Sequence, residues 1–377
     1  MKTTDMRFRR ADPSRPRRTD PFANNFNLLR LLAATLVIVS HAYNLGSATQ
    51  PLDPLERLLG SNRSLGWAGV GIFFTMSGYL IEGSISRSAS LASFAIGRFL
   101  RIFPGLVVCI LLSTAILGLF VSTMPFSEFI SNRQTIRFLL GNMTLLSVNY
   151  QLPSVFSQNP ASSAVNGSLW TMPFEISCYI VLGIAWGVGL MKDRRRTAIS
   201  LSALFVAIIG FTVVAPRLGD SASIARFGVM SRLAMCFLVG VACSAAKDVV
   251  RIRLYHVLGV VVAGLGAVVL DKTLIDLALS VVFGILTLWV AFVRHPFLKL
   301  VERMPDYSYG IYIYGFTVQQ LILSQYPQLP TGIHVFVAFL LVLIPAGLSW
   351  HLIEKPALRL KPKRSLSTSA PNVNPLA

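Results

Sequence analysis

Ten apolar stretches dominate this sequence, and each is close to the length that a helix needs to cross a lipid bilayer. They lie at 24–46, 66–86, 102–123, 168–190, 197–215, 227–246, 254–270, 273–293, 306–325 and 332–352. A spanning helix needs about 20 mostly apolar residues. Charged residues make up only 13% of the 377-residue chain, compared with about 25% in soluble domains. The sequence therefore predicts an all-α, polytopic integral membrane protein with about ten transmembrane helices.

The basic residues of the loops predict how these helices are oriented. If the N-terminus is cytoplasmic, 25 Lys and Arg residues fall on the cytoplasmic side and 7 on the outer side. Cytoplasmic loops carry such an excess in membrane proteins. We therefore expect both termini in the cytoplasm and a multi-pass protein of the inner membrane. The expected domains are a basic, disordered tail over 1–23, a membrane domain over 24–354 and a second basic tail over 355–377.

Two other classes of partner are not supported by the sequence. The net charge of +18 could suggest nucleic acid, but the charges lie between apolar runs and no polar face gathers base-reading or stacking residues. The four cysteines lie inside apolar runs without C-x-x-C spacing, and no H-x-x-x-H pair occurs. We therefore expect no nucleic-acid partner and no metal site. The longest outer connection, 124–167, contains an apolar piece at 136–148 that we interpret as an interfacial or re-entrant helix.

The first spanning segment carries two ionisable side chains, Arg30 and His41. They are eleven residues apart, which on a helix returns to nearly the same face about 16 Å further along the axis. Ionisable groups inside a bilayer are costly and usually face a cavity or a partner. The pattern predicts a functional polar stripe through the membrane. The alternative is an Arg that reaches the interface and a hydrogen-bonded core His.

Two further segments supply candidate binding groups near the cytoplasmic side. The second span reads GWAGVGIFFTMSGYLI; its glycines allow close helix packing, and Ser77 adds a hydroxyl. In FAIGRFLRIFP, Arg98 and Arg101 are three residues apart, so one helical face offers two guanidinium groups that match phosphate oxygens. Lipid headgroup contact is the alternative explanation for these arginines.

Glu175 lies in the fourth span, within NGSLWTMPFEISCY. We expect it one to two turns into the membrane from the outer side. A carboxylate there needs a partner, because burial disfavours its charged form.

These stretches together resemble acyltransferase family 3, the membrane O-acyltransferases related to exopolysaccharide, O-antigen and Nod-factor acetylation enzymes. Arg30 and His41 resemble the family's Arg-x10-His element, Ser77 to Leu80 its Ser-Gly-Tyr/Phe-Leu motif, and Arg98 to Arg101 its Arg-x-x-Arg element. SLWTMPFEISCY, YSYGIYIYGF and the final IEKP also fit, in order along the chain. One departure is Gly315, where many relatives have a histidine.

The resemblance implies an acyl-CoA donor on the cytoplasmic side, with acetyl as the common acyl group, and a hydroxyl of a cell-envelope or secreted saccharide as acceptor. The chain resembles the branch of the family without a fused extracytoplasmic domain. As a mechanism we expect His41 to act as the general base, since an imidazole accepts a proton at neutral pH. Glu175 would orient it. Arg98 and Arg101 would hold the CoA phosphates, with Arg30 and Ser77 along the route toward His41.

Several alternatives stay open at this point. The acyl group could pass through a covalent acyl-His or acyl-Ser intermediate. Intramembrane Arg, His and Glu would also suit a secondary transporter of a saccharide or lipid-linked intermediate, although no internal repeat is evident. A non-catalytic scaffold for polysaccharide synthesis would tolerate changes along the Arg30–His41 stripe.

Overall fold

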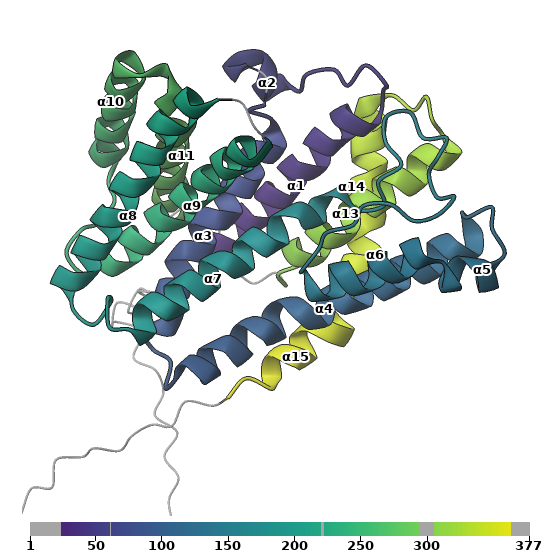
Figure 1. The fold of residues 1–377 in the computed structure, drawn as a ribbon, viewed down its shortest axis with the longest axis horizontal. Coiled ribbons are helices and arrows are strands. Elements are labelled where there is room, and N and C mark those ends of the chain that lie inside the picture. Colours follow the sequence, from purple (N-terminus) through teal and green to yellow (C-terminus); the bar gives the residue numbers. More distant parts are fainter. Residues whose placement is uncertain (1–23, 61, 220–221, 294–304, 363–377) are drawn as a thin grey trace, which may run out of the picture.

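Each of the ten predicted spans contains a helix in the structure, a computed structural model that describes residues 24–60, 62–219, 222–293 and 305–362. No strand occurs in these residues, which confirms the all-α prediction (Figure 1). The helices that fall in the predicted spans are α1 (Phe26–Leu45), α3 (Leu65–Ile85), α4 (Leu91–Phe120), α7 (Met172–Gly187), α8 (Arg194–Val214), α9 (Ala222–Ala246), α10 (Leu254–Leu270), α11 (Ile275–Phe292), α13 (Ser308–Gln325) and α14 (Thr331–Ser349).

Eight of the described helical segments are long and apolar enough to cross a membrane, and the chain is a polytopic membrane protein. The other two predicted spans are α10, which has 17 residues, and α13, which has 18 and is rich in polar side chains. The number of crossings and the cytoplasmic location of the termini stay predictions. The expected tail over 1–23 lies outside the described residues, as does most of the second one.

The centre of the bundle is α3, which packs against α1 on one side and α9 on the other (Figure 1). Glycines allow these contacts to be close. A Cβ on Gly78 would lie 2.0 Å from the carbonyl oxygen of Phe237 in α9, and one on Gly69 would lie 2.6 Å from that of Ala33 in α1. The predicted close packing of the glycine-rich span is confirmed at these two positions.

The helices α8, α10 and α11 gather at one side of the bundle (Figure 1). Only 6% of the most apolar window of the α8 span is buried against protein, so lipid must cover most of its side chains. The helices α10 and α11 form a tight hairpin. Asp271 and a single 3₁₀ turn, η3 (Lys272–Leu274), make the connection, and the Asp271 side chain accepts a hydrogen bond from the backbone N–H of Thr273.

The third span begins earlier than predicted. Its helix, α4, has 30 residues and starts where the Ser90 hydroxyl accepts a hydrogen bond from the backbone N–H of Ser93, a standard N-terminal cap. Arg98 and Arg101 therefore stand on the same helix as the span. At the other end of the chain, α14 passes through a π-helical turn, η4 (Trp350–Glu354), into α15 (Lys355–Arg359), which lies along α4 (Figure 1).

The long connection 124–167 covers one end of the bundle. It contains α5 (Phe126–Ser131) and α6 (Arg133–Thr144). The helix α6 packs against α4 and overlaps the segment 136–148, where a helix was predicted. A further short helix at this end is α2 (Pro54–Leu59), capped by the buried Asp53. The loop after α6 is tied to α13 by hydrogen bonds from Asn166 Nδ2 to the carbonyl of Ile313 and from Thr317 Oγ1 to that of Val165.

Candidate functional site

A cavity of about 110 Å³ lies among α1, α3, α4, α7 and α13. Five of the six predicted site residues line it: Arg30, Ser77, Arg98, Arg101 and Glu175. We call it the central cavity. Residues from five separate helices converge there, so the bundle brings together groups that lie far apart in the sequence.

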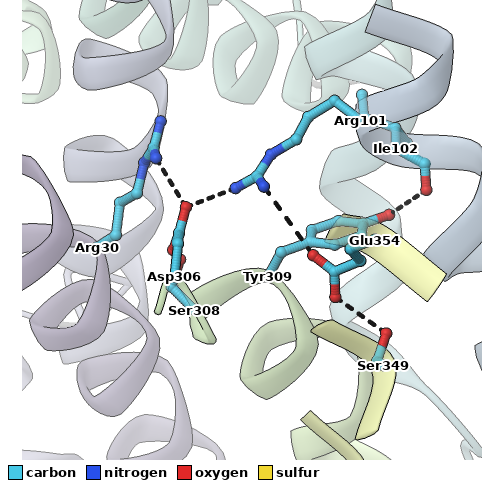
Figure 2. A network of polar contacts seen from close by, with 8 residues as sticks. All are labelled: Arg30, Arg101, Ile102, Asp306, Ser308, Tyr309, Ser349 and Glu354. Carbon is cyan, nitrogen blue, oxygen red and sulfur yellow. Dashed lines mark hydrogen bonds and ion pairs between the residues drawn. The ribbon is translucent and has the colours of Figure 1, made fainter. Parts of the chain in front are cut away.

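Two of the three arginines share one carboxylate. Arg30 Nη1 lies 2.8 Å from Asp306 Oδ2, and Arg101 Nη2 lies 2.6 Å from the same atom (Figure 2). Ser308 donates its hydroxyl to the other oxygen of Asp306. The Asp306 side chain is 10% exposed, and a buried carboxylate between two guanidinium groups is strongly held. Asp306 therefore fixes α1, α4 and the start of α13 to one another.

Arg101 has a second acidic neighbour at the π-helical turn. Glu354 Oε2 lies 4.0 Å from Arg101 Nη1, and its other oxygen accepts a hydrogen bond of 2.9 Å from Ser349 (Figure 2). The Arg101 guanidinium also lies over the rings of Tyr309 and Trp350, at 6.0 and 5.9 Å, a favourable cation–π arrangement. These contacts make Arg101 chiefly a structural cation.

Arg98 has different surroundings although it is only one turn away from Arg101. No described carboxylate forms an ion pair with it, and its buried Nε has no hydrogen-bond partner in the described part of the chain. Its guanidinium carbon lies 5.9 Å from the ring centroid of Phe94. A buried cationic donor without a partner is costly, so Arg98 is the arginine of the cavity that is free to take an anion.

Glu175 faces Ser77 and Tyr179 in the central cavity. The Tyr179 hydroxyl donates to Glu175 Oε1, Ser77 Oγ lies 3.3 Å from the same oxygen, and 2.8 Å separates the Ser77 and Tyr179 hydroxyl oxygens. The sequence placed Glu175 toward the outer side, beside His41. The structure instead brings Glu175 to the central cavity, because α7 packs against α3 at the level of Ser77.

His41 is the one predicted site residue that does not line the central cavity. Within the described residues no hydrogen bond or ion pair joins it to Glu175. Its ring packs edge-on against Phe316, with the centroids 4.9 Å apart. Phe316 lies one turn beyond Tyr312, which does line the cavity and whose hydroxyl bonds to Thr171 at 2.6 Å. The Tyr312–Phe316 face of α13 therefore contacts the cavity at one end and His41 at the other.

Three residues of this site were missed by the sequence analysis: Asp306, Tyr179 and Tyr312. For Asp306 a signal was present. Arg30 and Arg101 are two intramembrane cations that need a counter-ion, and Asp306 is the acidic residue at the start of the span 306–325. Tyr179 and Tyr312 resembled ordinary interfacial aromatics, and nothing in their spacing set them apart. Among the described residues no group of three or more His, Cys, Asp or Glu side chains could hold a metal. The expected absence of a metal site stays a prediction.

The fold and the site together define an integral membrane protein with a polar cavity enclosed among its helices. Residues 24–351 match the family described as Acyltransferase domain. The chain belongs to this family, acyltransferase family 3, and is a membrane O-acyltransferase.

Two characterised relatives agree with the family. The chain is 30% identical over 348 residues to the "O-acetyl transferase" of Shigella phage Sf6, which covers 91% of this chain and 99% of that protein. It is 28% identical over 374 residues to "Nodulation protein 10" of Rhizobium leguminosarum bv. viciae, a match that covers 90% of this chain and 94% of that protein. No solved structure gives a significant match.

Proposed function

We propose that this protein transfers an acyl group, most simply acetyl, from cytoplasmic acyl-CoA to a hydroxyl of a cell-envelope or secreted saccharide. The observation that carries the proposal is Arg98, a half-buried cation at the wall of a cavity inside the bundle, whose buried Nε has no hydrogen-bond partner and which has no carboxylate partner among the described residues. The Sf6 relative, by name an O-acetyl transferase, supports acetyl as the group.

In this proposal the cavity residues hold the donor. Arg98 binds a phosphate of CoA, since guanidinium groups match phosphate oxygens. Arg30 and Arg101, already bound to Asp306, give the adjacent wall its shape and positive charge. Glu175 fixes the hydroxyls of Ser77 and Tyr179, which line the path of the extended arm of CoA.

His41 is the general base of the proposed reaction. The acceptor oxygen forms a bond to the thioester carbonyl carbon while its proton passes to His41. The carbon–sulfur bond then breaks, and the CoA thiolate takes up the proton. For this step the acyl group has to pass the Tyr312–Phe316 face, because Phe316 lies against the His41 ring.

The test uses cells that contain or lack the protein, together with purified protein. Mass spectrometry of envelope glycans should show an added acetyl group only in cells with the wild-type chain. Arg98→Gln protein should bind acetyl-CoA at least about tenfold more weakly, the loss expected for one charged hydrogen bond, at an unchanged melting temperature. Glycans without any acyl addition, together with no acetyl-CoA binding by wild-type protein, would exclude the proposed function. Proton-coupled saccharide uptake without CoA release would support the transporter alternative.

A further inference from the structure

A second pocket adjoins the central cavity and shares Arg98 with it. Its volume is about 240 Å³, and it lies where α3 ends and α4 begins, closed on the other side by the residues that follow α15. Three cations line it, Arg87, Arg98 and Lys361, together with the hydroxyl residues Ser84, Ser88 and Ser93. We call it the basic pocket.

The three cations of the basic pocket differ from the other arginines of the site in their surroundings. In the described part of the chain, no carboxylate forms an ion pair with any of them, whereas Arg30 and Arg101 nearby are both paired. The Arg87 guanidinium lies against α3, where a Cβ on Gly83 would be 3.0 Å from its Nη1. Like charges gathered in a pocket repel one another and raise the local potential for an anion. The arrangement is that of a site for a multiply charged anion.

The sizes of the two cavities indicate which part of a donor each could hold. At about 110 Å³ the central cavity is far below the roughly 300–1,000 Å³ of pockets that bind whole small molecules. It is too small to hold a whole acyl-CoA molecule. The nucleotide end of the donor must therefore lie outside it, and the basic pocket is its neighbour, with Arg98 in the walls of both.

We propose that the basic pocket binds the phosphorylated nucleotide end of the CoA donor, with Arg87 and Lys361 on its 3′-phosphate and Arg98 on the diphosphate at the junction. The proposal rests on the proposed function and names the subsite that recognises the donor. The shared chemistry is an anionic phosphate ester: the 3′-phosphate of CoA is a monoester, and the headgroup of an anionic lipid such as phosphatidylglycerol is a diester. Because Arg98 lines both cavities, the position of the basic pocket favours the nucleotide.

The experiment compares acetyl-CoA with 3′-dephospho-acetyl-CoA. Dissociation constants are measured for purified full-length protein in nanodiscs of phosphatidylcholine and, separately, of phosphatidylglycerol. The variants are Lys361→Met and Arg87→Gln. The matched controls are Lys247→Met and Arg251→Gln, which change exposed cations that line neither cavity.

Wild-type and control proteins should bind acetyl-CoA about tenfold more tightly than the dephospho form. In Lys361→Met and Arg87→Gln protein that preference should fall to about twofold or less, with affinity for the dephospho form and the melting temperature unchanged. An equal loss for both ligands, or no loss, would overturn the inference while leaving the proposed function intact. The inference would also be overturned if wild-type protein bound acetyl-CoA and the dephospho form equally well and if phosphatidylglycerol weakened the binding of acetyl-CoA. That result would identify the pocket as a lipid site. Failure of wild-type protein to bind either ligand would instead count against the proposed function.

Discussion

Arg98 and Arg101 show how much two identical residues on one helix can differ. Their spacing predicts two equivalent phosphate ligands on one face. In the structure Arg101 is held by Asp306 at 2.6 Å, while the buried Nε of Arg98 has no partner in the described residues. Spacing within a helix cannot reveal this difference, because the counter-ion Asp306 belongs to a segment about 200 residues later in the chain.

Asp306→Asn should destabilise the protein. The substitution leaves Arg30 and Arg101 without the carboxylate that binds both, and breaking a buried ion pair by removing one partner costs about 3–5 kcal/mol. The melting temperature of detergent-purified protein should fall by several degrees. Ser308→Ala, which removes only a hydrogen bond to Asp306, is the control and should cost about 1 kcal/mol. An Asp306→Asn protein as stable as wild type would contradict the structural role of this network.

From the pKa of Lys361 we expect the proposed binding of acetyl-CoA to depend on pH. Burial, together with the neighbouring Arg98 and Arg101, lowers this pKa to about 8, and Arg87 adds a further cation to the same pocket. Because the charged form predominates below the pKa, the affinity that Lys361 gives to acetyl-CoA should be full below pH 8 and decline as the pH rises above it.

Titrating the dissociation constant of acetyl-CoA between pH 6.5 and 9.5 checks this prediction. Lys361→Arg protein keeps its charge throughout that range, so its affinity should stay level where that of the wild type declines. The same decline in both proteins would assign the pH dependence to another group.

Glycines at the contact between α3 and α9 decide how close these elements lie. A Cβ on Gly240 would lie 2.1 Å from the carbonyl oxygen of Thr75, so Gly240→Ala requires the helices to move apart. Overpacking of this kind costs about 1–3 kcal/mol. The control is Gly259→Ala in α10, where a Cβ meets nothing within 4 Å and alanine favours the helix. Thermal unfolding should separate the two variants, and equal stability would show that the helices are not in tight contact.

Helix positions were more predictable than helix ends. Hydrophobic length alone located all ten segments, since lipid allows few other structures. It could not show that α4 begins at Leu91 or that α14 continues through a π-helical turn to Arg359. Those ends depend on the cap at Ser90 and on the contact between α15 and α4. They matter because they place Arg98 and Lys361 at one pocket.

At the scale of the whole molecule, five helices contribute polar groups to one cavity. The sequence predicted a line of polar groups on α1, from Arg30 to His41. In the structure, Arg30 lies at the central cavity together with polar groups from four other helices. His41 does not line this cavity, and its ring packs against Phe316. How far Glu175 lies from His41 was not predictable, because it depends on which helices are neighbours and on where they cross.

The most direct test of this account is transfer of radiolabelled acetyl from acetyl-CoA in sealed, inside-out membrane vesicles. With the donor outside, and so in contact with the cytoplasmic face, wild-type vesicles should incorporate label into saccharide. Vesicles with His41→Ala protein should bind acetyl-CoA equally well and incorporate at least about 100-fold less, the effect expected for a general base. Undiminished incorporation by the His41→Ala protein, or label appearing only when the donor is inside the vesicles, would contradict the account.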